Sequence, residues 1–189
     1  MLRHHFRRFI IDIFCCKINQ LHYLKINAGN YVYEKMLTKI ISGGQTGADQ
    51  AGLDAAIKLN IPHGGWIPKG RLTENGPLPE KYHLQEMPNG SYPKRTEQNV
   101  IDSDATVIFS HGKLTGGSDL TRKKAEKLNK PWLHLDLDAM SVGYATRLLK
   151  SWIIDNGIKV LNVAGPRGSK DPKIYEVTLK IIAGALNHK

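Results

Sequence analysis

Beyond residue 35, short apolar runs alternate with longer segments in which apolar residues recur every three or four positions. Short apolar runs are typical of buried strands, and the wider spacing is typical of helices that pack on a sheet. Ala48, Ala51 and Ala55, for example, recur at helical spacing. Strands and helices that alternate in this order form βα units, whose strands run parallel. The pattern therefore predicts an α/β protein.

The fold class expected from this order of elements is a Rossmann-like three-layer sandwich with a mostly parallel sheet. The Pro- and Gly-rich stretch 68–92 is too long for a plain connection, so we expect an ordered or functional surface loop there, with a short strand near 84–87. The other expected strands lie near 37–42, 65–67, 105–109, 132–135 and 159–163. The expected helices span 47–59, 93–102, 118–130, 140–156 and 172–186.

The chain has two segments of different character. Residues 1–35 combine His, Arg and Lys with isolated apolar residues and show no clear period, whereas 36–189 carry the whole βα pattern. We therefore predict an N-terminal extension and, after it, a single Rossmann-like domain, whose size suits one hydrophobic core. A start codon assigned too early, with Met36 as the true start, would explain the extension. A disordered or an amphipathic targeting segment is the alternative.

The first expected strand ends in a glycine-rich loop directly before a helix. Its glycines let the backbone turn sharply and approach a ligand closely, and the helix that follows presents unpaired N–H groups to an anion. A tight turn capped by the Thr or Asp of the loop is an equally good interpretation. The spacing matches neither the dinucleotide-binding GxGxxG motif nor the P-loop. The candidate binding residues of this loop are Gly43, Gly44, Gln45, Thr46, Gly47 and Asp49.

Two later strands are expected to end in loops of the same kind. In the second loop, hydroxyl side chains and adjacent glycines precede a helix, and a histidine could donate a proton to an oxyanion. In the third loop, an arginine adds a planar cation that can bind two oxygens of a phosphate or carboxylate. Because the carboxyl ends of parallel strands meet at one edge of a sheet, we expect the three loops to form one ligand crevice. The candidate binding residues of these two loops are His111, Thr115, Gly116, Gly117, Ser118, Thr121, Gly165, Pro166, Arg167 and Ser169.

The residue types do not predict a metal site or catalysis. No pair of His, Asp or Glu has a recognised metal-ligand spacing, and no nucleophile with an adjacent base can be assembled. The two cysteines, Cys15 and Cys16, are adjacent and lie outside the loops, so neither a disulfide framework nor a cysteine metal site is expected. We therefore predict a binding protein rather than an enzyme, in a reducing, cytoplasmic compartment.

The formal charge of +10 raises the question of a polyanionic partner. The Lys and Arg residues are scattered, and only Arg122-Lys123-Lys124 forms a run, so the charge pattern favours a small anionic ligand over nucleic acid. No apolar stretch approaches the roughly 18 residues that a membrane span requires, so we expect no membrane partner.

In these loops the sequence resembles the molybdenum cofactor carrier family, also described as circularly permuted YpsA-like, within the group that includes the Lonely Guy and DprA Rossmann-like proteins. The resemblance runs through nearly all of the chain from Met36 onward, and several motifs in the same order make it specific. The chain departs from the family pattern at Gly168, where an acidic residue is expected, at Lys173 in place of glycine, and at Ile67 in place of cysteine. The matching segments are ISGGQTGADQAGLDAA (41–56), GGWIPKGRLTENGPLP (64–79), Arg95-Thr96, NVIDSDATVIF (99–109), TGGSDLT (115–121) and NVAGPRGS (162–169).

The resemblance implies a homo-oligomer that binds molybdenum cofactor as cargo, with molybdoenzymes as recipients. This cofactor is a molybdopterin with a terminal phosphate and an oxo-metal centre; backbone amides, hydroxyls and Arg167 would hold its oxyanions without ligating the metal. Lonely Guy enzymes carry a catalytic glutamate shortly after their Gly-Gly loop, where this chain has Lys123. The alternative function is that of a nucleotide or ADP-ribose sensor, or of a nucleotide-processing enzyme of the Lonely Guy kind.

Overall fold

The computed structural model describes residues 26–27, 30–31 and 37–187. The chain divides into two compact units, 1–35 and 36–189. In the first unit, β1 (Ile26–Asn27) pairs antiparallel with β2 (Asn30–Tyr31). The predicted nature of the N-terminal extension and of its start codon lies outside the described residues. All the other helices and strands among the described residues belong to the second unit.

A five-stranded sheet forms the centre of the second unit. The strands lie in the order β10-β9-β11-β3-β4, and every neighbouring pair is parallel. The predicted Rossmann-like α/β fold with a mostly parallel sheet is therefore confirmed. The strands are β3 (Lys39–Ser42), β4 (His63–Gly64), β9 (Ala105–Ser110), β10 (Trp132–Asp136) and β11 (Val160–Ala164).

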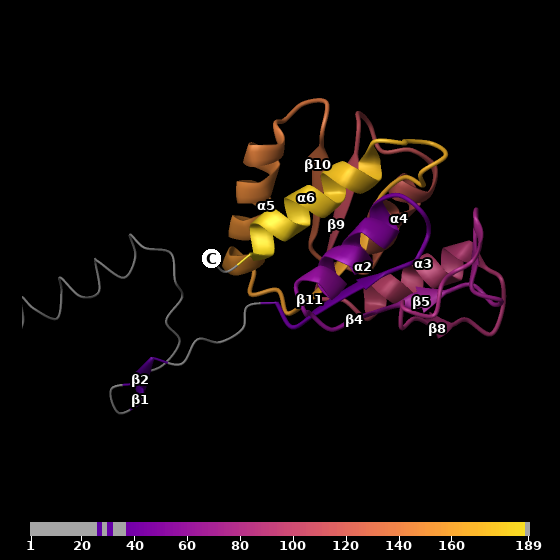
Figure 1. The fold of residues 1–189 in the computed structure, drawn as a ribbon, viewed down its shortest axis with the longest axis horizontal. Coiled ribbons are helices and arrows are strands. Elements are labelled where there is room, and N and C mark those ends of the chain that lie inside the picture. Colours follow the sequence, from indigo (N-terminus) through magenta and orange to yellow (C-terminus); the bar gives the residue numbers. More distant parts are fainter. Residues whose placement is uncertain (1–25, 28–29, 32–36, 188–189) are drawn as a thin grey trace, which may run out of the picture. The chain divides into compact units, whose positions relative to one another are not determined.

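Helices cover both faces of the sheet (Figure 1). Helix α6 packs between α2 and α5 on one face, and α3 packs beside α4 on the other. All six residues of β9 are buried, because a central parallel strand has no face left for solvent. None of the helices in the described part of the chain has the length and hydrophobicity needed to cross a membrane. The helices are α2 (Ala48–Lys58), α3 (Tyr92–Ile101), α4 (Gly116–Lys127), α5 (Val142–Asp155) and α6 (Ile174–Leu186).

The strand expected at 65–67 lies outside the central sheet, and a separate short strand precedes it. His63 and Gly64 form β4 in the central sheet, whereas β5 (Trp66–Ile67) pairs with β8 (Gln85–Glu86) outside it. The chain changes direction at Gly65, whose φ is 119° and where an added Cβ would lie 2.2 Å from the Ser42 carbonyl oxygen. Only glycine permits that conformation and that approach, so the chain passes at this point from the central sheet to a second, smaller sheet.

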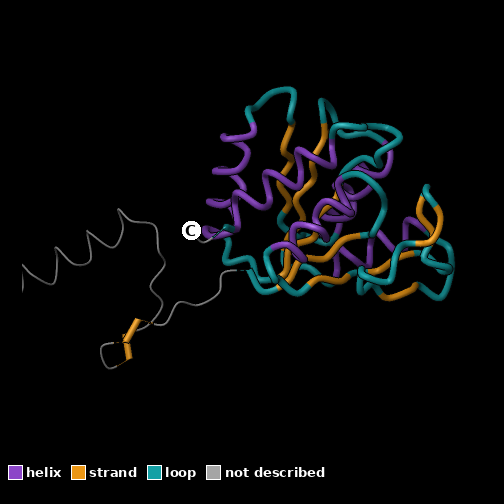
Figure 2. Tube along the Cα trace, viewed as in Figure 1, coloured by secondary structure: helices purple, strands orange, loops and turns teal. Residues whose placement is uncertain are grey.

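The stretch 68–92 is an ordered surface loop, as the sequence predicted. Leu78, Tyr82 and Leu84 are buried and join Leu53 of α2 and Ile67 in a second hydrophobic cluster. The loop also contains a hairpin that the sequence pattern did not reveal, in which β6 (Leu72–Thr73) pairs with β7 (Gly76–Pro77). Figure 2 shows these short strands apart from the central sheet.

Candidate functional site

A cavity of about 620 Å³ opens at the carboxyl ends of the three central strands, β9, β11 and β3. The chain leaves β9 toward α4 on one face and leaves β11 toward α6 on the other, so the crevice lies where the direction of winding changes. Ligands of open α/β sheets bind at such positions. The predicted residues that line this cavity are Gly43, Gln45, Asp49, Thr115, Gly116, Gly117, Ser118, Thr121, Gly165, Pro166 and Arg167.

The other predicted residues do not line the cavity but support the loops around it. A Cβ on Gly44 would lie 2.8 Å from Leu84, and one on Gly47 would lie 2.5 Å from the carbonyl oxygen of Pro166. His111 is paired through Nδ1 with Asp171 at 2.7 Å. The hydroxyls of the last two residues, Thr46 and Ser169, both bond to Glu74.

Helix α3 forms a wall of the cavity, although none of the predicted binding residues lies on it. Tyr92, Arg95, Thr96 and Asn99 line it and share one helical face. Because α3 runs antiparallel to β9, its first residues lie at the carboxyl edge of the sheet. The sequence shows that these polar residues recur at helical spacing. That spacing alone did not indicate that their side of the helix faces the cavity. Leu120, Asn162, Val163, Ala164 and Lys170 also line the cavity without having been predicted.

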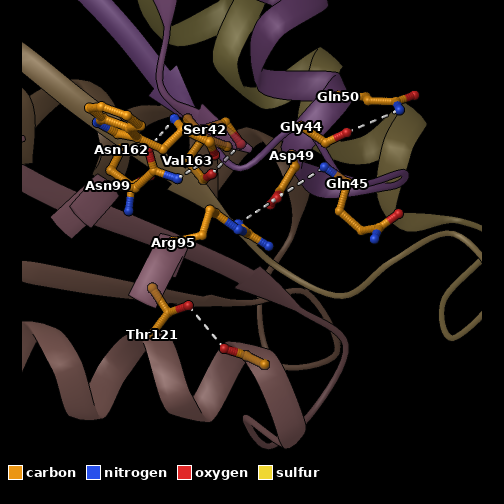
Figure 3. A network of polar contacts seen from close by, with 12 residues as sticks. Ser42, Gly44, Gln45, Asp49, Gln50, Arg95, Asn99, Thr121, Asn162 and Val163 are labelled. Carbon is orange, nitrogen blue, oxygen red and sulfur yellow. Dashed lines mark hydrogen bonds and ion pairs between the residues drawn. The ribbon is translucent and has the colours of Figure 1, made fainter. Parts of the chain in front are cut away.

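Arg95 and Asp49 form an ion pair at the wall of the cavity (Figure 3). One guanidinium nitrogen of Arg95 lies 3.6 Å from Asp49 Oδ2, which also accepts a hydrogen bond of 3.3 Å from the Gln45 backbone N–H. The guanidinium covers Gly43 so closely that an added Cβ would lie 1.5 Å from it. Arg95 Nε is buried without a hydrogen-bond partner. The long ion pair leaves the guanidinium with capacity to bind a further anion.

The Asp49 carboxyl is exposed over only 7% of its side chain. Burial raises its pKa from the ordinary 3.8 to about 6, because a charge is poorly solvated there. The positive charge of Arg95 and the hydrogen bond from Gln45 oppose this shift without cancelling it. Asp49 is the only carboxyl group among the residues that line the cavity, whereas Arg95, Arg167 and Lys170 are cations.

Two buried asparagines line the cavity and make different contacts. Asn99 binds the Trp66 backbone with both ends of its amide, because its oxygen accepts from the Trp66 N–H at 2.8 Å and its nitrogen donates to the Trp66 carbonyl at 3.1 Å. Asn162 Nδ2 donates to Thr106 Oγ1 at 3.1 Å, and its Oδ1 has no hydrogen-bond partner among the described residues. Asn162 therefore offers one acceptor to a polar ligand.

The first turn of α4 offers donors to the same cavity. Gly116 and Gly117 line it, and the N-cap Thr115 makes no side-chain hydrogen bond to the first turn. An uncapped helix N-terminus retains unpaired N–H groups and the positive end of the helix dipole, which favour an anion. Within the described ranges, no group of three or more His, Cys, Asp or Glu residues could hold a metal ion. The arrangement therefore suits an anionic organic ligand held by amides, hydroxyls and cations.

The chain is similar to known proteins in both its sequence and its fold. The model of the circularly permutated YpsA SLOG family matches residues 40–186, which run from β3 through α6. A crystal structure from Syntrophus aciditrophicus, named "Putative molybdenum carrier protein", is 57% identical to this chain, with a TM-score of 0.79. The match covers 81% of this chain and 97% of that chain. None of the curated proteins that were compared matches the chain.

Proposed function

Because the chain belongs to the circularly permutated YpsA SLOG family, we propose that it carries molybdenum cofactor, bound through its phosphate in the cavity at the carboxyl ends of the central strands. A related protein of known structure bears the name of a molybdenum carrier. Carrier function requires binding without conversion of the ligand, so we propose no catalytic step. Homo-oligomerisation and delivery to molybdoenzymes belong to the same proposal.

The charge of the cavity lining is the observation that supports this proposal most directly. Three cations, an uncapped helix N-terminus and a single carboxyl group, Asp49, line the cavity, so the cations outnumber the carboxylate even when Asp49 is charged and paired with Arg95. Such a lining attracts an anion, and a cavity of about 620 Å³ falls within the size range of sites for cofactor-sized molecules. The lining contains neither Cys nor His, so a metal in the cargo would keep the ligands that it arrives with.

Native mass spectrometry of the protein tests the proposal. The protein is purified from a host that makes molybdenum cofactor, and the same sample is analysed for metals and extracted for nucleotides. We expect molybdenum and a pterin to be retained together. A bound nucleotide without molybdenum would support the sensor function instead, and an empty protein would contradict the carrier function.

Substitution of Arg167 tests whether the cofactor binds in this cavity. Arg167→Ala removes a half-exposed cation from the cavity wall, so we expect cofactor retention to fall at least about tenfold without loss of the fold. The matched control is Arg147→Ala, which removes an exposed arginine of α5 that does not line the cavity. Equal retention by the two variants would place the cargo elsewhere.

An enzyme of the Lonely Guy kind would release free base from a nucleoside monophosphate. We propose that this chain does not, because Lys123 stands where the resemblance leads one to expect the catalytic glutamate. Prolonged incubation with nucleoside monophosphates, followed by chromatography of the bases, should detect no turnover. Measurable release of base would contradict the carrier proposal and support a nucleotide-processing enzyme.

A further inference from the structure

The carboxylate of Glu74, at the tip of the β6–β7 hairpin, lies in a ring of hydrogen-bond donors. The hydroxyls of Thr46 and Ser169 each donate to one of its oxygens, and the Ser169 backbone N–H donates at 3.1 Å. Gly168 N donates to Thr46 Oγ1 at 3.0 Å, which leaves the hydroxyl proton of Thr46 directed at Glu74. Arg167 Nε lies 3.8 Å from Glu74 Oε2. Hydroxyls, a backbone N–H and a guanidinium are the donors with which proteins bind phosphate.

Glu74 carries a full negative charge in this ring near neutral pH. Its partial burial would raise the pKa, but the hydrogen bonds from Ser169 and Thr46, together with the charge of Arg167, hold the pKa below its ordinary value. Three residues that the sequence assigned to a ligand anion, Thr46, Arg167 and Ser169, therefore bind an anion that belongs to the protein itself.

The ring around Glu74 is continuous with the cavity. Arg167 and Gln45 both line the cavity and both contact Glu74. Gln45 Oε1 accepts hydrogen bonds from the backbone N–H groups of Glu74, at 2.9 Å, and of Thr46, at 3.0 Å. The donors that bind the Glu74 carboxylate therefore lie next to those available to an anion in the cavity, and Arg167 belongs to both sets.

The hairpin is anchored at its base and bound at its tip through Glu74. At the base, the Arg71 guanidinium donates to four backbone carbonyls, among them those of Leu78 at 3.1 Å and Tyr82 at 2.9 Å. Between residues 72–77 and the rest of the described chain, every hydrogen bond and ion pair involves Glu74. Loss of the carboxylate contacts would leave the tip held to the rest of the described chain by one hydrogen bond, from the Glu74 backbone N–H to Gln45 Oε1, and would leave the base in place.

We propose that Thr46, Arg167 and Ser169 form an oxyanion site that the Glu74 carboxylate occupies in competition with the phosphate group of the ligand. Entry of the phosphate displaces Glu74, and the hairpin tip moves away about its anchored base. Return of the carboxylate restores the contacts shown here and helps to expel the ligand. This inference rests on the proposed function, because it assumes that the adjoining cavity receives a phosphate-bearing molecule.

Calorimetric titration of Glu74→Gln tests the competition. The substitution keeps the size of the side chain and removes its charge, so we expect inorganic phosphate or AMP to bind about tenfold more tightly than to the wild-type protein. The matched control is Glu80→Gln, which removes a carboxylate from the same loop; its side chain is 90% exposed and lies 3.5 Å from Arg71 Nε, and the four bonds of Arg71 to backbone carbonyls do not depend on it. This control corrects for the general effect of losing one negative charge.

The two probes distinguish the source of the oxyanion. A gain confined to inorganic phosphate indicates a site for the free ion, and a gain confined to AMP indicates a site for the phosphate of a larger ligand. Amide hydrogen exchange of 72–77 should become faster when the probe binds to the wild-type protein. Affinities of Glu74→Gln that are equal to or weaker than those of Glu80→Gln, for both probes, would overturn the inference and identify Glu74 as a structural latch.

Failure of this inference and failure of the proposed function give different results. If the wild-type protein retains molybdenum cofactor but Glu74→Gln gains no affinity for either probe, the carrier function stands and the competition is refuted. If Glu74→Gln binds phosphate more tightly but no cofactor is retained, the oxyanion site stands and the carrier proposal fails.

Discussion

Glycines around the cavity differ in what the absence of a side chain permits. At Gly43 it admits the Arg95 guanidinium, and at Gly47, with φ of 77°, it lets the Pro166 carbonyl oxygen approach within 2.5 Å of where a Cβ would lie. At Gly117 an added Cβ would meet nothing within 4 Å. The first two glycines are therefore required by the fold, whereas Gly117 lies beside open space in the cavity.

Gly117→Val separates ligand binding from folding. Gly117 is the second residue of α4, and its counterpart in α5, Gly143, is likewise a second residue, with its nearest neighbour 3.7 Å from an added Cβ. We expect Gly117→Val to weaken cofactor binding at least about tenfold and Gly143→Val to leave it unchanged. Chemical unfolding should show losses of stability for the two variants that agree within about 0.5 kcal/mol. A selective loss of stability in Gly117→Val would contradict this interpretation.

The buried carboxyl of Asp49 makes stability depend on pH. Because its pKa is about 6 in the folded protein and about 3.8 in the unfolded chain, the folded state holds the proton more tightly. The stabilising contribution of this group is complete below about pH 4 and is lost as the pH rises through about 6. A shift of about two pKa units corresponds to about 3 kcal/mol.

We therefore expect Asp49→Asn to gain stability relative to the wild-type protein as the pH rises from about 4 to 7, by up to about 3 kcal/mol. Urea unfolding of both proteins at a series of pH values measures this difference. Arg95 loses its ion-pair partner in the variant only above about pH 6, where Asp49 is charged, and the folded-state pKa of Asp49 already includes the attraction to Arg95. The pH dependence of the difference, rather than its absolute value, is thus the test, and a constant difference would refute the raised pKa.

At the scale of elements, a single carboxylate joins α2 to the surface loop and to α6. Asp54 of α2 accepts hydrogen bonds from Tyr82 at 3.0 Å and from Tyr175 of α6 at 2.7 Å, and it pairs with Lys81 at 3.0 Å. Its side chain is only 19% exposed. These contacts explain how a long Pro- and Gly-rich segment is held in one position beside the cavity.

Asp54→Ala should destabilise the protein by about 2 kcal/mol, because two tyrosine hydroxyls lose a charged acceptor. The control is Asp155→Ala, which removes an exposed carboxylate at the end of α5. Urea unfolding measures both variants, and protection of the 78–84 amides from hydrogen exchange should fall only in Asp54→Ala. Equal stability of the two variants would show that the apolar cluster alone holds the loop.

At the scale of the whole molecule, the order of the strands brings the polar loop residues together at one edge of the sheet. Because β11 lies between β9 and β3, loops from three distant parts of the sequence meet at one edge. The same order places the first residues of α3 and α4 beside those loops. Residues far apart in sequence therefore combine into one positively charged cavity.

The division of the chain into two units predicts that the second unit folds alone. A protein that begins at Met36 contains the whole sheet, all the cavity residues and the Asp54 contacts. We propose that it unfolds cooperatively with the stability of the full chain, within about 0.5 kcal/mol, and retains the same cargo. Parallel unfolding curves and native mass spectra test this, and a lower stability of the shorter protein would assign a structural role to residues 1–35.

The alternation of apolar runs and helical segments was sufficient to predict the α/β class, the parallel sheet and most of the element bounds, because burial on two faces of a sheet imposes a local pattern. The three glycine-rich loops could also be predicted from the sequence, because a strand that ends directly before a helix requires residues that turn sharply. Their convergence followed from the parallel connections. The sequence thus determined where the cavity would form.

Tertiary structure alone decided which residues occupy that site. Nothing local marks Glu74 as the partner of Ser169, which lies 95 positions further along the chain, or the face of α3 that carries Arg95 as the one beside Gly43. The passage of the chain from one sheet to another at Gly65 depended on the Ser42 carbonyl oxygen beside it. Periodicity reports whether a residue is buried, whereas the identity of its partner depends on how distant segments pack, because hydrogen bonds and ion pairs act only over a few ångströms.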